Sequence, residues 1–185
     1  MKALCLIFSL LLLTLISFQV FGFSVEIDNK IVDKSVVSRN INLFASHKIN
    51  EHIGVTAFSL TSKGWSEVYI GPEFYLARWL TVSASIGLET APKSWRTAIS
   101  LWTGKGPVSL LAIYENGGSG YWYNISAFYQ VNKWLKAGVL SKRFLGTGPQ
   151  IKVSIPNTPF QAWWSIGYDT EVDKTKQMIG VVVVY

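Results

Sequence analysis

Residues 79–89, WLTVSASIGLE, alternate between apolar and polar side chains. From Leu80 to Leu88 every second residue is apolar, and the residues between them are Thr, Ser or Gly. A period of two places successive side chains on opposite faces of a β-strand. The stretch therefore predicts a strand with one apolar and one polar face. A soluble barrel would point the apolar face inward at a core, whereas a membrane barrel would point it outward at lipid.

Similar segments recur along the rest of the chain. After Ser24 no window keeps helical spacing for more than about a dozen residues. Turn signals such as NGGSG (116–120) and PNTP (156–159) separate segments of period two, which is the pattern of an all-β sandwich or barrel. We predict about 12 strands, with 10 as the alternative count. Their ranges are 24–32, 37–48, 52–62, 66–77, 80–90, 95–103, 107–115, 121–131, 134–144, 148–155, 160–169 and 176–185.

The order of residues on the apolar face favours lipid over a core. In 121–131 this face carries Tyr121 and Tyr123 at one end, Ile125 and Ala127 in the middle and Tyr129 at the other end. Aromatic rings at both ends of an aliphatic stretch are typical of the interfacial girdles of transmembrane barrels. The polar face is rich in Ser, Thr, Asn, Gln and Gly rather than in the Lys and Glu usual on a water-exposed surface. The sequence predicts an all-β fold, a single antiparallel up-and-down transmembrane β-barrel.

The first 22 residues have the layout of a secretory signal peptide. Lys2 precedes an apolar run over 3–18, and Val20 and Gly22 stand at the −3 and −1 positions of a cut before Phe23. A single-pass membrane anchor is the alternative, because the run approaches the length needed to span a bilayer. We predict a signal peptide over 1–22 and one barrel domain over 23–185. Cys5 is the only cysteine and lies in the signal peptide, so disulfides would not stabilise the exported chain.

The charges are spread along the chain rather than gathered in a basic patch. The sequence has 17 Lys and Arg against 11 Asp and Glu, a net charge of +6, with no run longer than two like charges. We therefore predict no nucleic-acid partner. Glu89 and Arg96 face each other across a short loop and are expected to pair near the outer mouth. The charged residues on the polar, inward face, and so the candidate lumen lining, are Glu67, Glu73, Glu89, Arg96, Lys136, Lys142 and Lys152.

These inward charges allow two interpretations. They could form an ion-paired network that fills the lumen, or line a pore and bias the passage of ions. Trp102, Trp122 and Trp163 also have inward parity and are expected to narrow the lumen. A barrel of eight strands is filled by side chains and one of 16 or more leaves a channel, so 12 strands fall between these cases.

No constellation of residues indicates catalysis or a metal. His47 and His52 flank a turn beside Glu51, but a metal site needs a third or fourth convergent ligand. Ser46 adjoins His47, yet neighbouring strand positions point to opposite faces and cannot share a proton. The glycine-rich NGGSG lies between two strands without a following helix, which favours a hairpin loop over a phosphate site. We predict no catalytic residue, no metal and no cofactor.

The chain ends in MIGVVVVY, which resembles the terminal assembly signal of bacterial outer-membrane β-barrels through Gly180, Val183 and Tyr185. The stretches FYLARWLTVSASIG and FYQVNKWLKAGVLS also resemble each other, as repeated hairpins of such barrels do. The resemblance implies export to the outer membrane of a Gram-negative-type bacterium. It also implies outer-membrane lipid and the barrel assembly machinery as partners.

The sequence leaves three classes of function open. We expect a narrow passive pore for small solutes or ions, or a structural barrel, and no enzyme. The first alternative is an exported soluble barrel that binds an apolar ligand inside, which requires the opposite orientation of the faces. The second is a barrel lipid hydrolase, whose activity would depend on His47 or His52.

Overall fold

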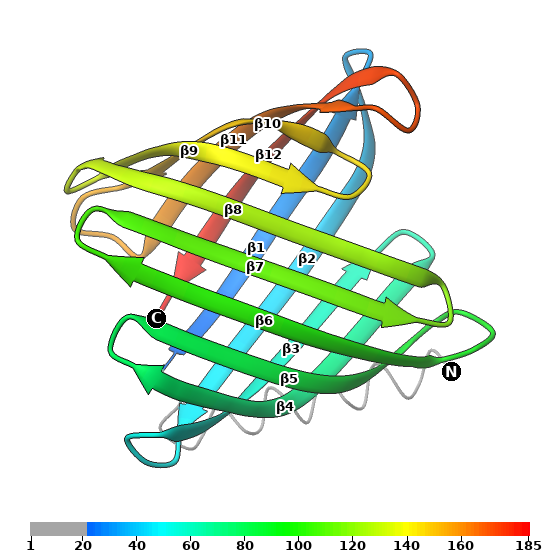
Figure 1. The fold of residues 1–185 in the computed structure, drawn as a ribbon. Helices are drawn as coiled ribbons and strands as arrows, with labels where there is room; N and C mark the ends of the chain where they lie inside the picture. Colours follow the sequence, from blue (N-terminus) through cyan, green and yellow to red (C-terminus); the bar gives the residue numbers. More distant parts are fainter. Residues whose placement is uncertain (1–21) are drawn as a thin grey trace.

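The computed structural model describes residues 22–185, and these form one closed barrel of antiparallel strands (Figure 1). The prediction of 12 strands is confirmed, and every strand begins and ends within two residues of its predicted bounds. The predicted signal peptide lies outside the described residues except for Gly22, at which β1 begins, so it stays a prediction. The strands are β1 (Gly22–Val32), β2 (Ser35–Lys48), β3 (Ile53–Ser62), β4 (Trp65–Ala77), β5 (Leu80–Glu89), β6 (Trp95–Lys105), β7 (Val108–Gly117), β8 (Gly120–Asn132), β9 (Leu135–Lys142), β10 (Gly146–Ser154), β11 (Phe160–Asp169) and β12 (Lys174–Val184).

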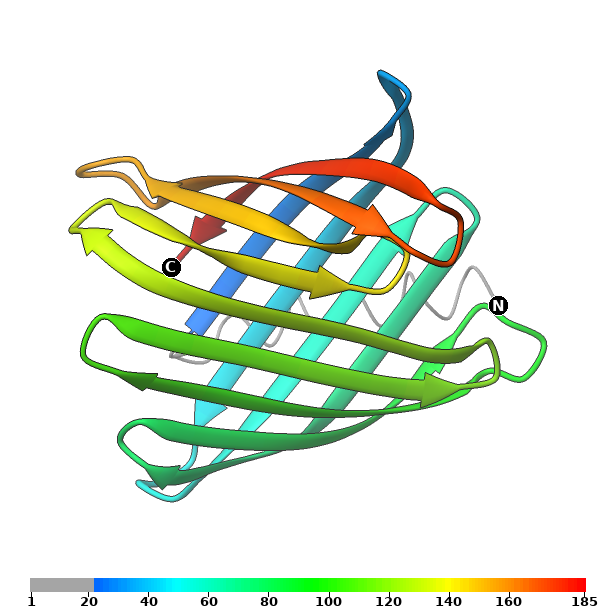
Figure 2. The same ribbon diagram turned by 45° about the horizontal axis from the view of Figure 1, so that its top comes forward.

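The topology is up-and-down, because each strand pairs with its neighbours in sequence and β1 pairs with β12. This closing pair runs in register from Ser24 opposite Val184 to Ile31 opposite Gln177. Figure 2 shows the strands as one tilted sheet that curves back on itself. Closure satisfies the backbone donors and acceptors that an open sheet would leave at its edges.

All the connections between strands are short. No connection within residues 22–185 is longer than five residues, so the barrel carries no inserted domain there. In the turn between β1 and β2, Asp33 and Lys34 have φ of 49° and 65°, as a type I′ hairpin turn requires. Five turns lie at the end of the barrel where Tyr185 lies, which we call the C-terminal end, at the left of Figure 1. We call the opposite end, which carries the other six turns, the distal end.

The apolar parity of the strands faces outward and the polar parity faces the lumen. On β5, Ile86 is 70% exposed, whereas Ser83 and Glu89 on the other parity are 8% and 3% exposed. The same division holds on β6, where Ile99 is exposed and Arg96 is buried. A barrel that binds an apolar ligand in its interior would need the reverse. Among the described residues no helix is long and apolar enough to cross a membrane.

Large side chains fill part of the lumen. Leu140, Leu145, Trp163, Met178 and Val182 form a buried cluster on the side of β9, β11 and β12. Trp163 lies over Gly180 on the neighbouring strand, where a Cβ would come within 2.6 Å of the indole Cε2. Glycine opposite an inward aromatic ring therefore makes room for that ring against the barrel wall.

Candidate functional site

A cavity of about 340 Å³ opens into the distal end of the lumen. Its wall combines aromatic rings with charged side chains drawn from strands on all sides of the barrel. Four cations and one carboxylate are the charged residues that line it, namely Lys30, Arg96, Lys142, Arg143 and Glu67. One of the cations, Arg96, forms an ion pair with the carboxylate of Glu67, so the basic character of the cavity comes from the other three.

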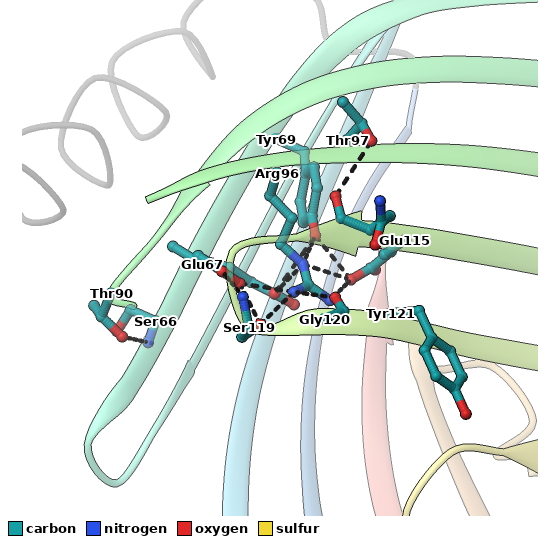
Figure 3. A network of polar contacts seen from close by, with 12 residues as sticks. Ser66, Glu67, Tyr69, Thr90, Arg96, Thr97, Glu115, Ser119, Gly120 and Tyr121 are labelled. Atoms are coloured by element: carbon teal, nitrogen blue, oxygen red, sulfur yellow. Dashed lines mark hydrogen bonds and ion pairs between the residues drawn. The ribbon is translucent and has the colours of Figure 1, made fainter. Parts of the chain in front are cut away.

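Arg96 is the centre of a buried ion-pair cluster at this end of the barrel (Figure 3). Its Nη1 lies 2.7 Å from Glu89 Oε2, its Nη2 3.0 Å from Glu115 Oε2 and its Nε 3.2 Å from Glu67 Oε2. The hydroxyl of Tyr69 accepts from Arg96 Nε and donates to Glu115 Oε2 at 2.8 Å. Four consecutive strands, β4 to β7, thus supply one guanidinium and three carboxyl groups to a single corner of the lumen.

The register of the sheet explains why the cluster needs a cation. Glu67 and Glu89 lie directly opposite each other on β4 and β5. Like charges in opposed positions destabilise a sheet. The Arg96 side chain, one strand further on, lies within ion-pair distance of both carboxylates and compensates this repulsion.

The same cluster fixes the turn between β7 and β8. Ser119 donates from its backbone N to Glu89 Oε1 at 2.6 Å and from its hydroxyl to Glu89 Oε2 at 2.7 Å. Arg96 Nη1 donates to Ser119 Oγ at 2.7 Å. Because Ser119 also lines the cavity, these bonds hold the turn at the rim of the distal opening. The cluster therefore sets the shape of one side of the mouth.

Acidic and basic groups also occupy the opposite wall. Asp28 on β1 is fully buried and accepts from the amides of Asn40 at 2.8 Å and Asn42 at 2.9 Å. Lys176 on β12 forms an ion pair with Asp169 on β11 and donates to the carbonyl of Phe144. Each of these charges has its hydrogen-bonding partners on neighbouring strands or turns.

The seven charged residues predicted for the lumen all lie on inward parity, but in different surroundings. Glu67, Glu89 and Arg96 meet in the cluster, and Glu89 and Arg96 form the ion pair that their positions predict. Glu73 accepts from the hydroxyl of Tyr75 at 2.9 Å, away from the cluster. The three lysines lie on the facing strands β9 and β10, where Lys136 is opposite Lys152 in register.

Two of these three lysines lie over aromatic rings. Lys142 Nζ lies 5.5 Å from the centre of the Trp122 ring, and Lys152 Nζ lies 5.4 Å from that of Phe128. None of the ion pairs found within residues 22–185 includes Lys136, Lys142 or Lys152. They form a basic side of the lumen across from the acidic residues of β4, β5 and β7.

Sequence reasoning missed several lumen charges, namely Glu26, Asp28, Lys30, Glu115, Asp169 and Lys176. Three of them alternate in the segment SVEIDNKIV, a clear signal of period two on the first strand. Glu115 is harder to find, because β7 carries Leu111 and Ile113 on the same inward parity and alternates little. The missing member of the Arg96 cluster thus lies on the strand with the weakest pattern.

The three tryptophans predicted to narrow the lumen differ in exposure. Trp163 is 6% exposed and belongs to the apolar cluster, whereas Trp122 lines the distal cavity. Trp102 lies near the C-terminal end over Gly104, and it is 42% exposed. Only Trp163 packs as a core residue.

The residues of the predicted assembly signal lie on β12 or directly after it. Gly180 packs against Trp163, Val183 is on outward parity, and Tyr185 is 74% exposed at the end of the barrel. The backbones of Tyr185 and Phe23 exchange two hydrogen bonds, of 2.9 and 3.2 Å. Recognition of these residues by assembly machinery stays a prediction.

The histidines do not converge on a site with other ligands. His52 lies 3.4 Å from Glu51 in an exposed turn, and His47 and Ser46 occupy opposite parities of β2. Within residues 22–185 no group of three or more His, Cys, Asp or Glu side chains could hold a metal ion.

No protein-family model and no curated protein sequence matches the chain. Among solved structures, the fold is similar to that of the KdgM porin, with a TM-score of 0.57 and 13% identity over 86% of this chain and 98% of that one. A structure of the KdgM porin in complex with disordered oligogalacturonate gives the same values. The NanC porin is similar with a TM-score of 0.52 and 13% identity over 87% of this chain and 98% of that one. At this identity the likeness establishes a porin-like barrel fold.

Proposed function

We propose that the protein is a narrow passive pore in the outer membrane of a Gram-negative-type bacterium, with a preference for small anionic solutes. It would reach this membrane through the predicted signal peptide over 1–22. Gly180, Val183 and Tyr185 would present it to the barrel assembly machinery. The observation that carries the proposal is a polar, charged lumen inside a closed barrel whose outer surface is apolar. No catalytic step is involved.

The outer surface supports a lipid environment. Large apolar side chains are exposed on all twelve strands, among them Ile41, Leu76, Ile99, Val139 and Ile179. Leaving a side chain of this kind in water costs about 1.5–3 kcal/mol relative to burial, and soluble proteins rarely expose large contiguous apolar patches. An apolar belt around the whole barrel therefore requires lipid.

The positions of the aromatic side chains support the same environment. Tyr121 and Tyr129 are exposed at opposite ends of β8, and Phe160 and Tyr168 at opposite ends of β11. Rings at both ends of a strand fit the two headgroup regions of a bilayer.

The charge distribution supports a preference for anions. Three cations outside the Arg96 cluster, Lys30, Lys142 and Arg143, line the distal cavity, and Lys136 and Lys152 continue the basic side inward. The carboxylates of Glu67, Glu89 and Glu115 share the guanidinium of Arg96, which reduces the negative field they present to a solute. A basic lining favours entry of anions. Because the KdgM porin was solved with oligogalacturonate, an acidic oligosaccharide is the first solute to test.

A swelling assay on liposomes tests the proposal. Vesicles that contain the folded protein should swell in an isotonic solution of a small acidic sugar faster than in one of a neutral sugar of similar size. Lys142→Gln together with Lys152→Gln should reduce this ratio, whereas Lys133→Gln, in an exposed turn outside the lumen, should leave it unchanged. Equal rates for both sugars in the wild type would contradict the preference for anions.

A structural barrel without transport is the second candidate. The buried cluster around Trp163 fills one side of the lumen and favours it. Vesicles that swell no faster than protein-free vesicles, although the protein is folded, would support this function over a pore.

A further inference from the structure

We propose that the turns at the C-terminal end of the barrel bind the headgroups of anionic phospholipids. This inference rests on the membrane location proposed above but concerns the outside of the barrel rather than its lumen. The site consists of three exposed cations, Arg78, Lys105 and Lys133, together with the exposed rings of Trp79 and Trp134. We call this set the basic rim.

The cations of the basic rim occupy successive turns. Arg78 and Trp79 form the turn between β4 and β5, and Lys133 and Trp134 form the turn between β8 and β9. Lys105, between them around the barrel, ends β6 on the outward parity. Figure 1 shows these turns side by side at the end where the C-terminus lies. Turns two strands apart are separated by roughly 10 Å, so each cation can meet a different headgroup.

Backbone hydrogen bonds connect the turns into a continuous rim. The carbonyl of Trp79 accepts from Gly104 at 3.0 Å, and that of Pro107 accepts from Gln130 at 2.7 Å. The carbonyl of Trp134 accepts from Ser154 at 2.8 Å. The spacing of the three cations is therefore set by the barrel rather than by mobile loops.

The two turns with tryptophan share their local structure. The strand before each one contains a bulge, between Tyr75 and Ala77 in β4 and between Gln130 and Asn132 in β8. A cation followed by an exposed tryptophan comes next in both cases, and Trp79 and Trp134 are 49% and 44% exposed. Tryptophan at the membrane interface sits at the level of the headgroups, so the cation beside it lies within reach of lipid phosphate.

The cations of the basic rim are available for a ligand. None of the ion pairs found within residues 22–185 includes Arg78, Lys105 or Lys133. The nearby Glu51 lies 3.4 Å from His52, and Lys48 lies over the ring of Tyr75 on the lumen side. The occupant must be anionic and must lie beside an apolar belt, since exposed Leu76 and Val131 flank the same turns. An anionic phospholipid meets both conditions.

The distal end provides a matched control. Its turns also carry exposed lysines, Lys34, Lys63 and Lys93. None of these is directly followed by a tryptophan, and the tryptophans two residues after Lys63 and Lys93 begin strands β4 and β6. Asp33, which precedes Lys34, forms an ion pair with Lys174 at 3.2 Å. Replacing these three lysines removes the same number of charges from the other end of the barrel.

The test compares the wild type with two triple variants, Arg78→Gln/Lys105→Gln/Lys133→Gln and Lys34→Gln/Lys63→Gln/Lys93→Gln. Each is folded in neutral detergent, and micelles containing phosphatidylglycerol, phosphatidylcholine or lipopolysaccharide are added. The first readout is the lipid that stays bound in native mass spectrometry. The second is the temperature to which a sample must be heated before its folded band disappears from the gel. We expect phosphatidylglycerol to bind and to raise this temperature in the wild type and the distal variant. Each cation removed from the basic rim should weaken binding by about fivefold.

Three results would overturn the inference. They are equal effects of the two lipids on the wild type, retention of the phosphatidylglycerol effect in the basic-rim variant, and a selective effect of lipopolysaccharide that is lost in that variant. The last result would assign the rim to the other leaflet. The swelling rate of the basic-rim variant should match the wild type, because its residues lie outside the lumen. Loss of swelling in all proteins with lipid binding intact would refute the pore and leave the basic rim standing.

Discussion

Replacing Arg96 with Met tests how much the buried cluster stabilises the barrel. Methionine is long and apolar enough to fit the site but cannot pair with the three carboxyl groups at 2.7, 3.0 and 3.2 Å. The Arg96 side chain is only 4% exposed, so water replaces little of what is lost. Removing one partner of a buried ion pair costs about 3–5 kcal/mol, because the remaining charge is left uncompensated. We expect a loss of this size in the free energy of unfolding.

The assay is urea-induced unfolding in vesicles of a neutral phospholipid, followed by tryptophan fluorescence and by the fraction of protein that runs as the folded band. Lys142→Met is the control, since it also removes a lumen cation, but one that lies 5.5 Å from the centre of the Trp122 ring and belongs to none of the ion pairs found within residues 22–185. A cation–π contact reached by water contributes about 0.5–1 kcal/mol. If both variants lose the same stability, or if Arg96→Met loses less than 1 kcal/mol, the cluster does not stabilise the barrel as argued.

Two further pairs of substitutions test the packing of the wall and the assignment of its faces. Gly180→Ala places a Cβ against Trp163 and should lower the free energy of unfolding by about 1–3 kcal/mol in the same urea assay. Adding Trp163→Leu should remove most of the steric clash with this Cβ. If the losses of the two substitutions are instead additive, the two residues are not coupled. Ile86→Arg, at an outward position 70% exposed, should cost about 2–4 kcal/mol if it lies near the bilayer midplane, and Ser85→Arg on the inward parity should cost much less. Equal tolerance at these two positions would mean that the lipid and lumen faces are wrongly assigned.

The fold was predictable because each strand carries its own signal. In β5 the alternation from Leu80 to Leu88 is sufficient to define the strand and its two faces. Which of the two faces points at lipid had to be inferred from the aromatic residues of other strands, since one amphipathic strand fits either orientation. The short turns then left little freedom in the order of the strands.

The candidate site was only partly predictable. Glu89 and Arg96 are separated by one short hairpin, so their pairing follows from local geometry. The contribution of Glu67 and Glu115 depends on the register between β4, β5, β6 and β7, which alternation does not determine. Glu67 and Glu89 lie directly opposite each other, and without the guanidinium of Arg96 their repulsion would argue against the observed register.

The dimensions of the lumen could not be predicted from parity. Inward tryptophans were expected to narrow it, but Trp163 packs into a buried cluster while Trp122 lines an open cavity. The difference arises because Gly180 leaves space for the Trp163 ring against the wall. Such pairings join residues on neighbouring strands and become visible only with the sheet in register.

Conductance across a planar lipid bilayer tests the central claim most directly. Wild-type protein, shown to be folded by its gel mobility before boiling, should produce discrete current steps. In a gradient of potassium chloride the reversal potential should have the sign of chloride preference, because the distal cavity is lined mainly by cations. Folded protein that inserts into the bilayer and produces no current steps would contradict the account of this barrel as a pore.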